Sequence, residues 1–72
     1  MKRVAILCGG PGSEHEISCL SAGGVLSAIN RDEYEPILIG ITRQGEWMSL
    51  PPDYPLALEN GTLPSVSGNY PE

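Results

Sequence analysis

One helical pattern between two apolar runs constrains the fold of this chain more than any other feature. Residues 4–8 form a continuous apolar run that ends at a glycine-rich turn, and residues 37–41 form a second run after Pro36. Continuous runs of this length are typical of strands that are buried on both faces, as in parallel sheets. The order predicts a strand–helix–strand unit with a right-handed crossover.

The helical pattern follows the turn at residues 9–12. Ser13 and Glu16 have the spacing of a capping box, in which each side chain satisfies a backbone N–H of the first turn. Two adjacent glycines, at 23 and 24, each cost about 1 kcal/mol relative to alanine, which is reasonable where a helix packs closely on a sheet. We expect Asn30 to end the helix. The apolar residues that recur with the helical period are Ala22, Val25, Leu26 and Ile29, widened by Ile17, Leu20 and Ala28.

The residues after the second apolar run predict a hairpin and then a long irregular segment. Residues 43–45 contain a glycine and suit a hairpin loop, and residues 46–48 start a short return strand, where we expect Trp47 to pack on the hairpin. From Pro51 the chain is rich in proline and has no lysine or arginine. We expect a long loop there, or a segment ordered only by contact with something outside the chain.

The predicted fold class is α/β: a parallel sheet with one covering helix and a hairpin. Parallel sheets occur almost only with both faces covered, and one helix covers one face. The 72 residues amount to about half of an ordinary domain. We therefore expect the chain to be the first part of a longer protein, with residues 1–50 a partial α/β domain and residues 51–72 a proline-rich loop or insertion. The missing helices would come from more chain or from a partner.

Charge and cysteine content exclude several classes of protein. Nine acidic against four basic residues give a net charge of −5, which argues against nucleic-acid binding. Apolar runs are too short for a membrane span or a signal peptide. We expect a cytoplasmic protein, in which Cys8 and Cys19 are free thiols buried as small apolar side chains. Two cysteines and one histidine also exclude a dense disulfide scaffold or a Cys/His zinc site.

The turn between the first strand and the helix is where a ligand is expected, because open α/β sheets bind ligands at the carboxyl ends of their strands. It lacks the third glycine of the dinucleotide fingerprint and the lysine of a phosphate loop. Glu14 and Glu16 would repel a phosphate, so a cation, such as a metal or a substrate ammonium, fits better. Each also has a structural explanation, Glu14 at the positive helix end and Glu16 in the capping box. His15 is expected at the surface, and these three residues do not specify a metal site.

Residues 9–18, GGPGSEHEIS, closely resemble the N-terminal signature of the D-alanine–D-alanine ligases. The resemblance covers about residues 3–50 and weakens in the proline-rich tail. It implies a three-domain ATP-grasp enzyme of peptidoglycan synthesis, in which the carboxylate of one D-alanine is phosphorylated and the amine of a second attacks the acylphosphate. D-alanine–D-lactate and D-alanine–D-serine ligases share the signature, so the second substrate stays open. A small α/β binding module that folds with a partner is the alternative.

The resemblance also implies roles for residues of the signature. Glu14 falls on an active-site glutamate that anchors the ammonium of the first D-alanine, within a hydrogen-bonded group that includes a serine and a tyrosine from later domains. Ile17 falls on the apolar position beside that substrate's methyl group, while His15 and Glu16 serve helix-start geometry. ATP and Mg²⁺ or Mn²⁺ would be bound by domains absent from this chain. The resemblance further implies a homodimer for the intact enzyme and no activity for this chain alone.

Overall fold

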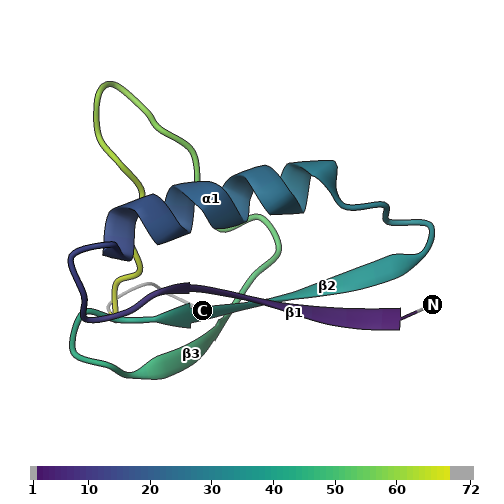
Figure 1. The fold of residues 1–72 in the computed structure, drawn as a ribbon, viewed down its shortest axis with the longest axis horizontal. Helices are drawn as coiled ribbons and strands as arrows, with labels where there is room; N and C mark the ends of the chain where they lie inside the picture. The colour runs from purple at the N-terminus through teal and green to yellow at the C-terminus, as the bar shows by residue number, and fades with distance from the viewer. Residues whose placement is uncertain (1, 69–72) are drawn as a thin grey trace.

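The computed structural model describes residues 2–68 as one helix over a three-stranded sheet (Figure 1). The elements follow in the order β1 (Lys2–Gly9), α1 (His15–Ala28), β2 (Tyr34–Ile41) and β3 (Trp47–Leu50). In the sheet, β2 lies between β1, to which it is parallel, and β3, to which it is antiparallel. The predicted α/β class, the parallel pair and the return hairpin are confirmed.

The strands extend further than the apolar runs that predicted them. β1 begins at Lys2, and β2 begins at Tyr34, so Pro36 lies inside β2, where it is paired with Val4. β3 pairs only with residues 38–41 of β2. Pro36 therefore lies where β1 is the only neighbouring strand within the described chain. A proline is tolerated at such a place because a missing N–H is not needed on the open side.

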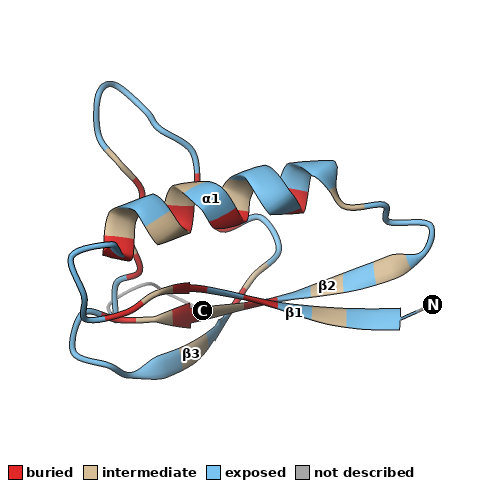
Figure 2. Cartoon of the chain, in the orientation of Figure 1, coloured by how far each residue is buried: buried red, intermediate tan, exposed pale blue. Residues whose placement is uncertain are grey.

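The buried face of α1 is narrower than the predicted apolar stripe. Its buried residues are His15, Cys19, Ala22 and Leu26, which lie on one side of the helix at spacings of three and four. Val25, part of the predicted stripe, is 52% exposed because it lies on a flank of α1 that no described element covers. The core lies between α1 and the sheet (Figure 2). It comprises Ile6, Cys8, Cys19, Ala22, Leu26, Leu38, Leu50, Tyr54, Leu56 and Val66.

The proline-rich segment packs on the rest of the chain, so the expectation that only an outside contact orders it is wrong. Tyr54, Leu56 and Val66 are buried in the core. Within the described part of the segment, which ends at residue 68, the strand-like pairing is an isolated bridge between Glu59 and Thr62, as expected of a long loop. One helix and three short strands leave much apolar surface open. Each large apolar side chain of the segment that covers this surface stabilises the fold by roughly 1.5–3 kcal/mol when it is fully buried.

Gly23 lies against this segment and not against the sheet. A Cβ at Gly23 would lie 2.5 Å from the carbonyl oxygen of Leu56, whereas a Cβ at Gly24 would meet nothing within 4 Å. The sequence pattern predicted close packing for both glycines. The structure shows it for Gly23 alone, on the flank of α1 that the segment covers.

We expect Gly24→Ala to raise the free energy of unfolding and Gly23→Ala to lower it. Alanine gains about 1 kcal/mol over glycine inside a helix, and Gly24 has open space for a methyl group. At Gly23 the methyl group would push Leu56 away, and overpacking of this kind costs about 1–3 kcal/mol. Urea unfolding followed by circular dichroism measures both variants, which are matched controls for each other. Equal stabilisation would show that the segment does not pack on α1.

The other face of the sheet has no element over it within residues 2–68. Leu7, Ile37 and Trp47 are 46%, 37% and 65% exposed on it. Trp47 thus lies in the open and does not pack on the hairpin as predicted. The strands are also not buried on both faces within this part of the chain, since the single helix covers one face. The pairing register places six apolar residues on the open face: Ala5, Leu7, Ile37, Ile39, Ile41 and Trp47.

Candidate functional site

Backbone hydrogen bonds hold the turn between β1 and α1 against the end of β2. The N–H of Gly10 donates to the carbonyl oxygen of Ile41 at 2.7 Å, and the N–H of Gly9 donates to Ser18 Oγ at 3.1 Å. Gly9 and Gly10 have φ angles of 94° and 103°, which only glycine adopts without strain. The turn is thereby fixed at the carboxyl ends of the two parallel strands, the usual ligand edge of such sheets.

The helix begins too late for the predicted capping box. Glu14 is the N-cap residue, and its side chain makes no capping hydrogen bond. A hydrogen bond from His15 N to Gly12 O, at 3.3 Å, closes a tight turn that includes Ser13. Glu16 is then the second helical residue, whereas a capping box needs the third. The predicted roles of Ser13 and Glu16 at the helix start are therefore wrong.

Glu16 pairs instead with Arg43 in the loop between β2 and β3. The distance from Arg43 Nη2 to Glu16 Oε2 is 3.1 Å, and both side chains are about half exposed. An exposed ion pair contributes about 1 kcal/mol at most. Sequence reasoning missed this pair because its members are 27 positions apart. The pairing occupies Glu16 and distinguishes it from the neighbouring carboxylate of Glu14.

The two predicted site residues, Glu14 and Ile17, lie three positions apart at the start of α1, a spacing that makes side chains neighbours on a helix surface. Glu14 is exposed, and within residues 2–68 its carboxylate has no hydrogen bond or ion pair. Ile17 is 49% exposed. The structure therefore presents an unpaired carboxylate beside an accessible apolar side chain. This combination suits a small ligand that has both a cationic group and a short apolar group.

His15 is buried, so its predicted place at the surface is wrong. Its side chain is 1% exposed; Nδ1 lies 2.7 Å from the carbonyl oxygen of Gly10, and Nε2 lies 3.0 Å from the backbone nitrogen of Val66. The N–H of Val66 can only donate, so Nε2 accepts and Nδ1 carries the proton that it donates to Gly10. No local sequence pattern indicates this arrangement, because Val66 lies 51 positions away in the irregular segment.

Cys8 and Cys19 are free thiols buried in the core, as predicted. Burial raises the pKa of Cys8 from 9.0 to about 12, with Cys19 adding to the effect, and burial also raises the pKa of Cys19. The thiolate is the nucleophilic form of cysteine. These two side chains therefore contribute packing and no nucleophile near neutral pH.

We expect neither thiol to react with an aromatic disulfide reagent at pH 8 until the chain is unfolded in urea. Because the pKa of folded Cys8 lies above 9.0, its contribution to stability is complete below pH 9 and is lost as the pH rises towards 12. The urea concentration at the midpoint of unfolding should accordingly be lower at pH 10 than at pH 8. Rapid labelling of the folded chain, or a rising midpoint, would contradict the burial of this thiol.

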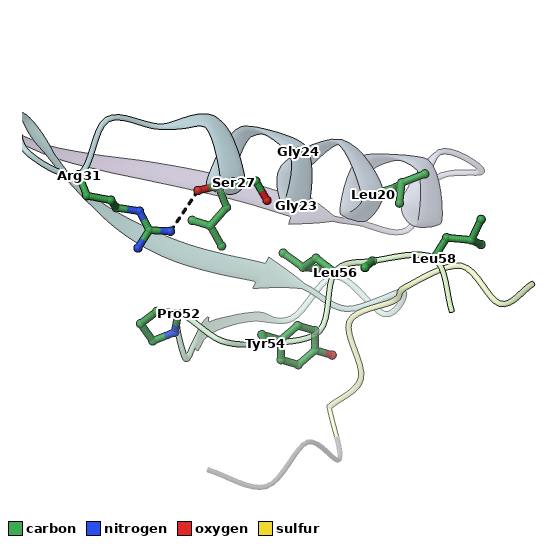
Figure 3. Close-up of a pocket in the computed structure, with 11 residues that line it drawn as sticks. Leu20, Gly23, Gly24, Ser27, Arg31, Pro52, Tyr54, Leu56 and Leu58 are labelled. Atoms are coloured by element: carbon green, nitrogen blue, oxygen red, sulfur yellow. Dashed lines mark hydrogen bonds between the residues drawn. The ribbon is translucent and has the colours of Figure 1, made fainter. Parts of the chain in front are cut away.

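A pocket of about 500 Å³ is lined by one side of α1 and by residues of the segment 52–58 (Figure 3). Its lining is mainly apolar and includes Leu20, Leu56 and Leu58. At one end, Arg31 Nη2 donates to the carbonyl oxygen of Leu26 at 3.0 Å, which satisfies a carbonyl of the last helical turn. No carboxylate, thiol or imidazole lines this pocket. The turn that bears Glu14 remains the candidate site.

No group of three or more His, Cys, Asp or Glu side chains among residues 2–68 is arranged to hold a metal ion. No helix in the same range has the length and apolar character needed to cross a membrane.

Residues 3–68 match the protein family described as "D-ala D-ala ligase N-terminus". The chain belongs to this family. The resemblance first noted at residues 9–18 is thus confirmed over most of the chain. The D-alanine–D-alanine ligase of Frankia casuarinae is 48% identical over 65 residues, and that of Mycobacterium leprae is 44% identical over 66 residues. These alignments cover 89% and 90% of this chain, and 17% of each relative.

A solved structure from the same group of ligases has the same local fold. The VanG D-Ala:D-Ser ligase from Enterococcus faecalis is 46% identical, with a TM-score of 0.62, over 64% of this chain and 13% of its own chain. The chain thus spans about one sixth of the length of its curated relatives.

Proposed function

We propose that the chain is the N-terminal part of an ATP-dependent ligase that joins two D-alanines, and that Glu14 binds the ammonium of the first. One observation carries the proposal: the exposed carboxylate of Glu14 has no partner within residues 2–68, while Glu16, two positions on, is paired with Arg43. Hydrogen bonds between an ammonium and a carboxylate are among the stronger ones in proteins. Half-exposed Ile17, three positions on, offers an apolar contact for the methyl group of D-alanine.

Glu14 acts by positioning and transfers no proton. With the ammonium held, the carboxylate of the first D-alanine is oriented for phosphorylation, and such positioning supplies much of the catalysis in two-substrate reactions. The amine of the second D-alanine then attacks the acylphosphate carbon, and phosphate leaves. ATP and Mg²⁺ supply the phosphoryl group and the compensating positive charge. The described residues do not fit that role: they contain no three-residue metal cluster, and the unpaired carboxylate of Glu14 at the turn repels phosphate.

The second substrate could instead be D-serine, since VanG is a D-Ala:D-Ser ligase and is 46% identical over the aligned region. In the proposed site this chain contacts only the first D-alanine. Its residues would then serve ligases of D-alanine, D-serine or D-lactate equally, and the choice among them lies with other parts of the enzyme.

The test is the release of phosphate from ATP by the complete ligase that carries this segment. We expect D-alanine alone to support release and the dipeptide to accumulate. A requirement for D-serine or D-lactate would move the second substrate to that compound, and no release with any of the three would refute the proposal. Residues 1–72 alone are expected to release no phosphate. Release from that chain would contradict the assignment of ATP to other domains.

A further inference from the structure

His15 connects the turn that bears the site to a distant part of the chain. It is the first residue of α1, directly after Glu14, and both of its ring nitrogens contact backbone groups. One group is the carbonyl of Gly10 in the turn, and the other is the N–H of Val66 in the irregular segment. The backbone is thereby held on both sides of the Gly10 Cα, since the N–H of Gly10 already donates to Ile41 and its carbonyl contacts His15. An apolar side chain of the same size would fill this space without making either link.

Tyr54 fixes the far side of this connection. Its hydroxyl donates to the carbonyl oxygen of Ser65 at 2.7 Å and accepts a hydrogen bond from the N–H of Ser67 at 3.4 Å. Val66 lies between these two residues, and its side chain is buried in the core. The N–H of Val66 is therefore held in a set position relative to His15. This gives a continuous path from Tyr54 through Val66 and His15 to the turn.

We infer that His15 is a positioning residue: Val66 holds its imidazole with the proton on Nδ1, and the imidazole holds the Gly10 turn and the start of α1 so that Glu14 meets the first D-alanine. The inference rests on the proposed function of Glu14. His15 itself is buried beneath the turn and contacts no substrate. Its predicted contribution is to substrate binding, through the orientation of the neighbouring carboxylate.

The first test is the tautomer of the His15 ring, read from ring nitrogen–proton spectra of the complete ligase. Signals that are absent from a His15→Gln variant belong to His15. We expect Nδ1 to be protonated and slow to exchange its proton, and Nε2 to be the unprotonated nitrogen that accepts from Val66. We also expect Tyr54→Phe to speed that exchange, because it removes the hydroxyl that holds residues 65–67. A proton on Nε2, or a mixture of tautomers, would overturn the inference.

The second test separates the two hydrogen bonds by kinetics. His15→Asn places an amide near Nδ1 that can donate to Gly10 but offers Val66 no acceptor, whereas His15→Gln offers an acceptor near Nε2 and loses the donor. We expect both to raise KM for the first D-alanine, by about tenfold for His15→Gln, since even a misplacement of about 1 Å can cost about a hundredfold. KM for ATP should be nearly unchanged in both variants, because the binding of ATP is assigned to other domains.

Leu26→Ala is the matched control, because Leu26 is buried on the same face of α1 near its other end. It should lower stability without changing KM for the first D-alanine. His15 would be shown to serve stability alone by either of two results. One is an equal rise in KM for D-alanine with Leu26→Ala, and the other is an equal rise in the KM values for ATP and D-alanine with the His15 variants. If Glu14→Gln raises this KM and the His15 variants do not, only this inference fails. If Glu14→Gln has no effect either, the proposed function fails.

Discussion

Gly9→Ala is expected to lower the free energy of unfolding by about 3 kcal/mol or more, a large share of the stability of a chain of this size. The φ angle of Gly9 is 94°, and a Cβ there would clash with the carbonyl oxygen of Ile41 and lie 3.1 Å from His15 Cε1. Backbone strain contributes about 1–3 kcal/mol. The displaced Ile41 carbonyl would also lose the hydrogen bond from Gly10 that closes the turn.

Two other glycines of the turn are the controls for this prediction. Gly10 has a φ of 103° but open space around its Cα, so Gly10→Ala should cost only the backbone strain. Gly12 has neither a positive φ nor a close neighbour, and Gly12→Ala should be nearly neutral. Urea unfolding of the three variants should give losses in the order Gly9, Gly10, Gly12. Equal losses would mean that the turn does not lie against the end of β2.

Glu14→Gln is expected to raise KM for the first D-alanine by about ten- to a hundredfold in the complete ligase. A hydrogen bond to a charged group contributes about 1.5–3 kcal/mol, which corresponds to factors of this size. Stability should hardly change, because the carboxylate has no partner within residues 2–68. Initial rates at varied D-alanine, with saturating ATP, measure the effect.

Glu16→Gln is the matched control, since it makes the same change two positions away. It removes the ion pair with Arg43, which is exposed and contributes about 1 kcal/mol at most. KM for D-alanine should therefore stay near the wild-type value. Unchanged KM and kcat in Glu14→Gln, or equal changes in both variants, would contradict the role assigned to Glu14.

The order of elements could be predicted from sequence because it depends on local patterns. The two apolar runs and the helical period place β1, α1 and β2, and the glycine at position 45 places the hairpin before β3. Because the sequence predicts a single helix, it also predicts that one face of the sheet stays uncovered. The exposure of Leu7 and Ile37 confirms this. Locating the candidate turn needed only the rule that ligands bind at the carboxyl ends of parallel strands.

The long-range contacts could not be predicted, because no local pattern records them. His15 was expected at the surface since its two partners are backbone groups, one of them in a segment with no periodicity. The spacing of Ser13 and Glu16 fits a capping box and predicted that role for Glu16. The turn at Gly12 shifts the start of the helix, and Glu16 pairs with Arg43 instead. The packing of Tyr54 in the core could not be predicted either, because the proline-rich sequence around it has no periodic pattern.

Whether Glu14 binds the substrate ammonium is tested most directly by comparing D-alanine with propionate, which has the same carboxylate and methyl group but no ammonium. The affinities of the complete ligase for both compounds are measured with the wild-type protein and with Glu14→Gln, as a cycle that isolates the interaction between the two charges. The preference of the wild-type protein for D-alanine is expected to fall about tenfold or more in the variant. An unchanged preference would show that the ammonium is bound elsewhere.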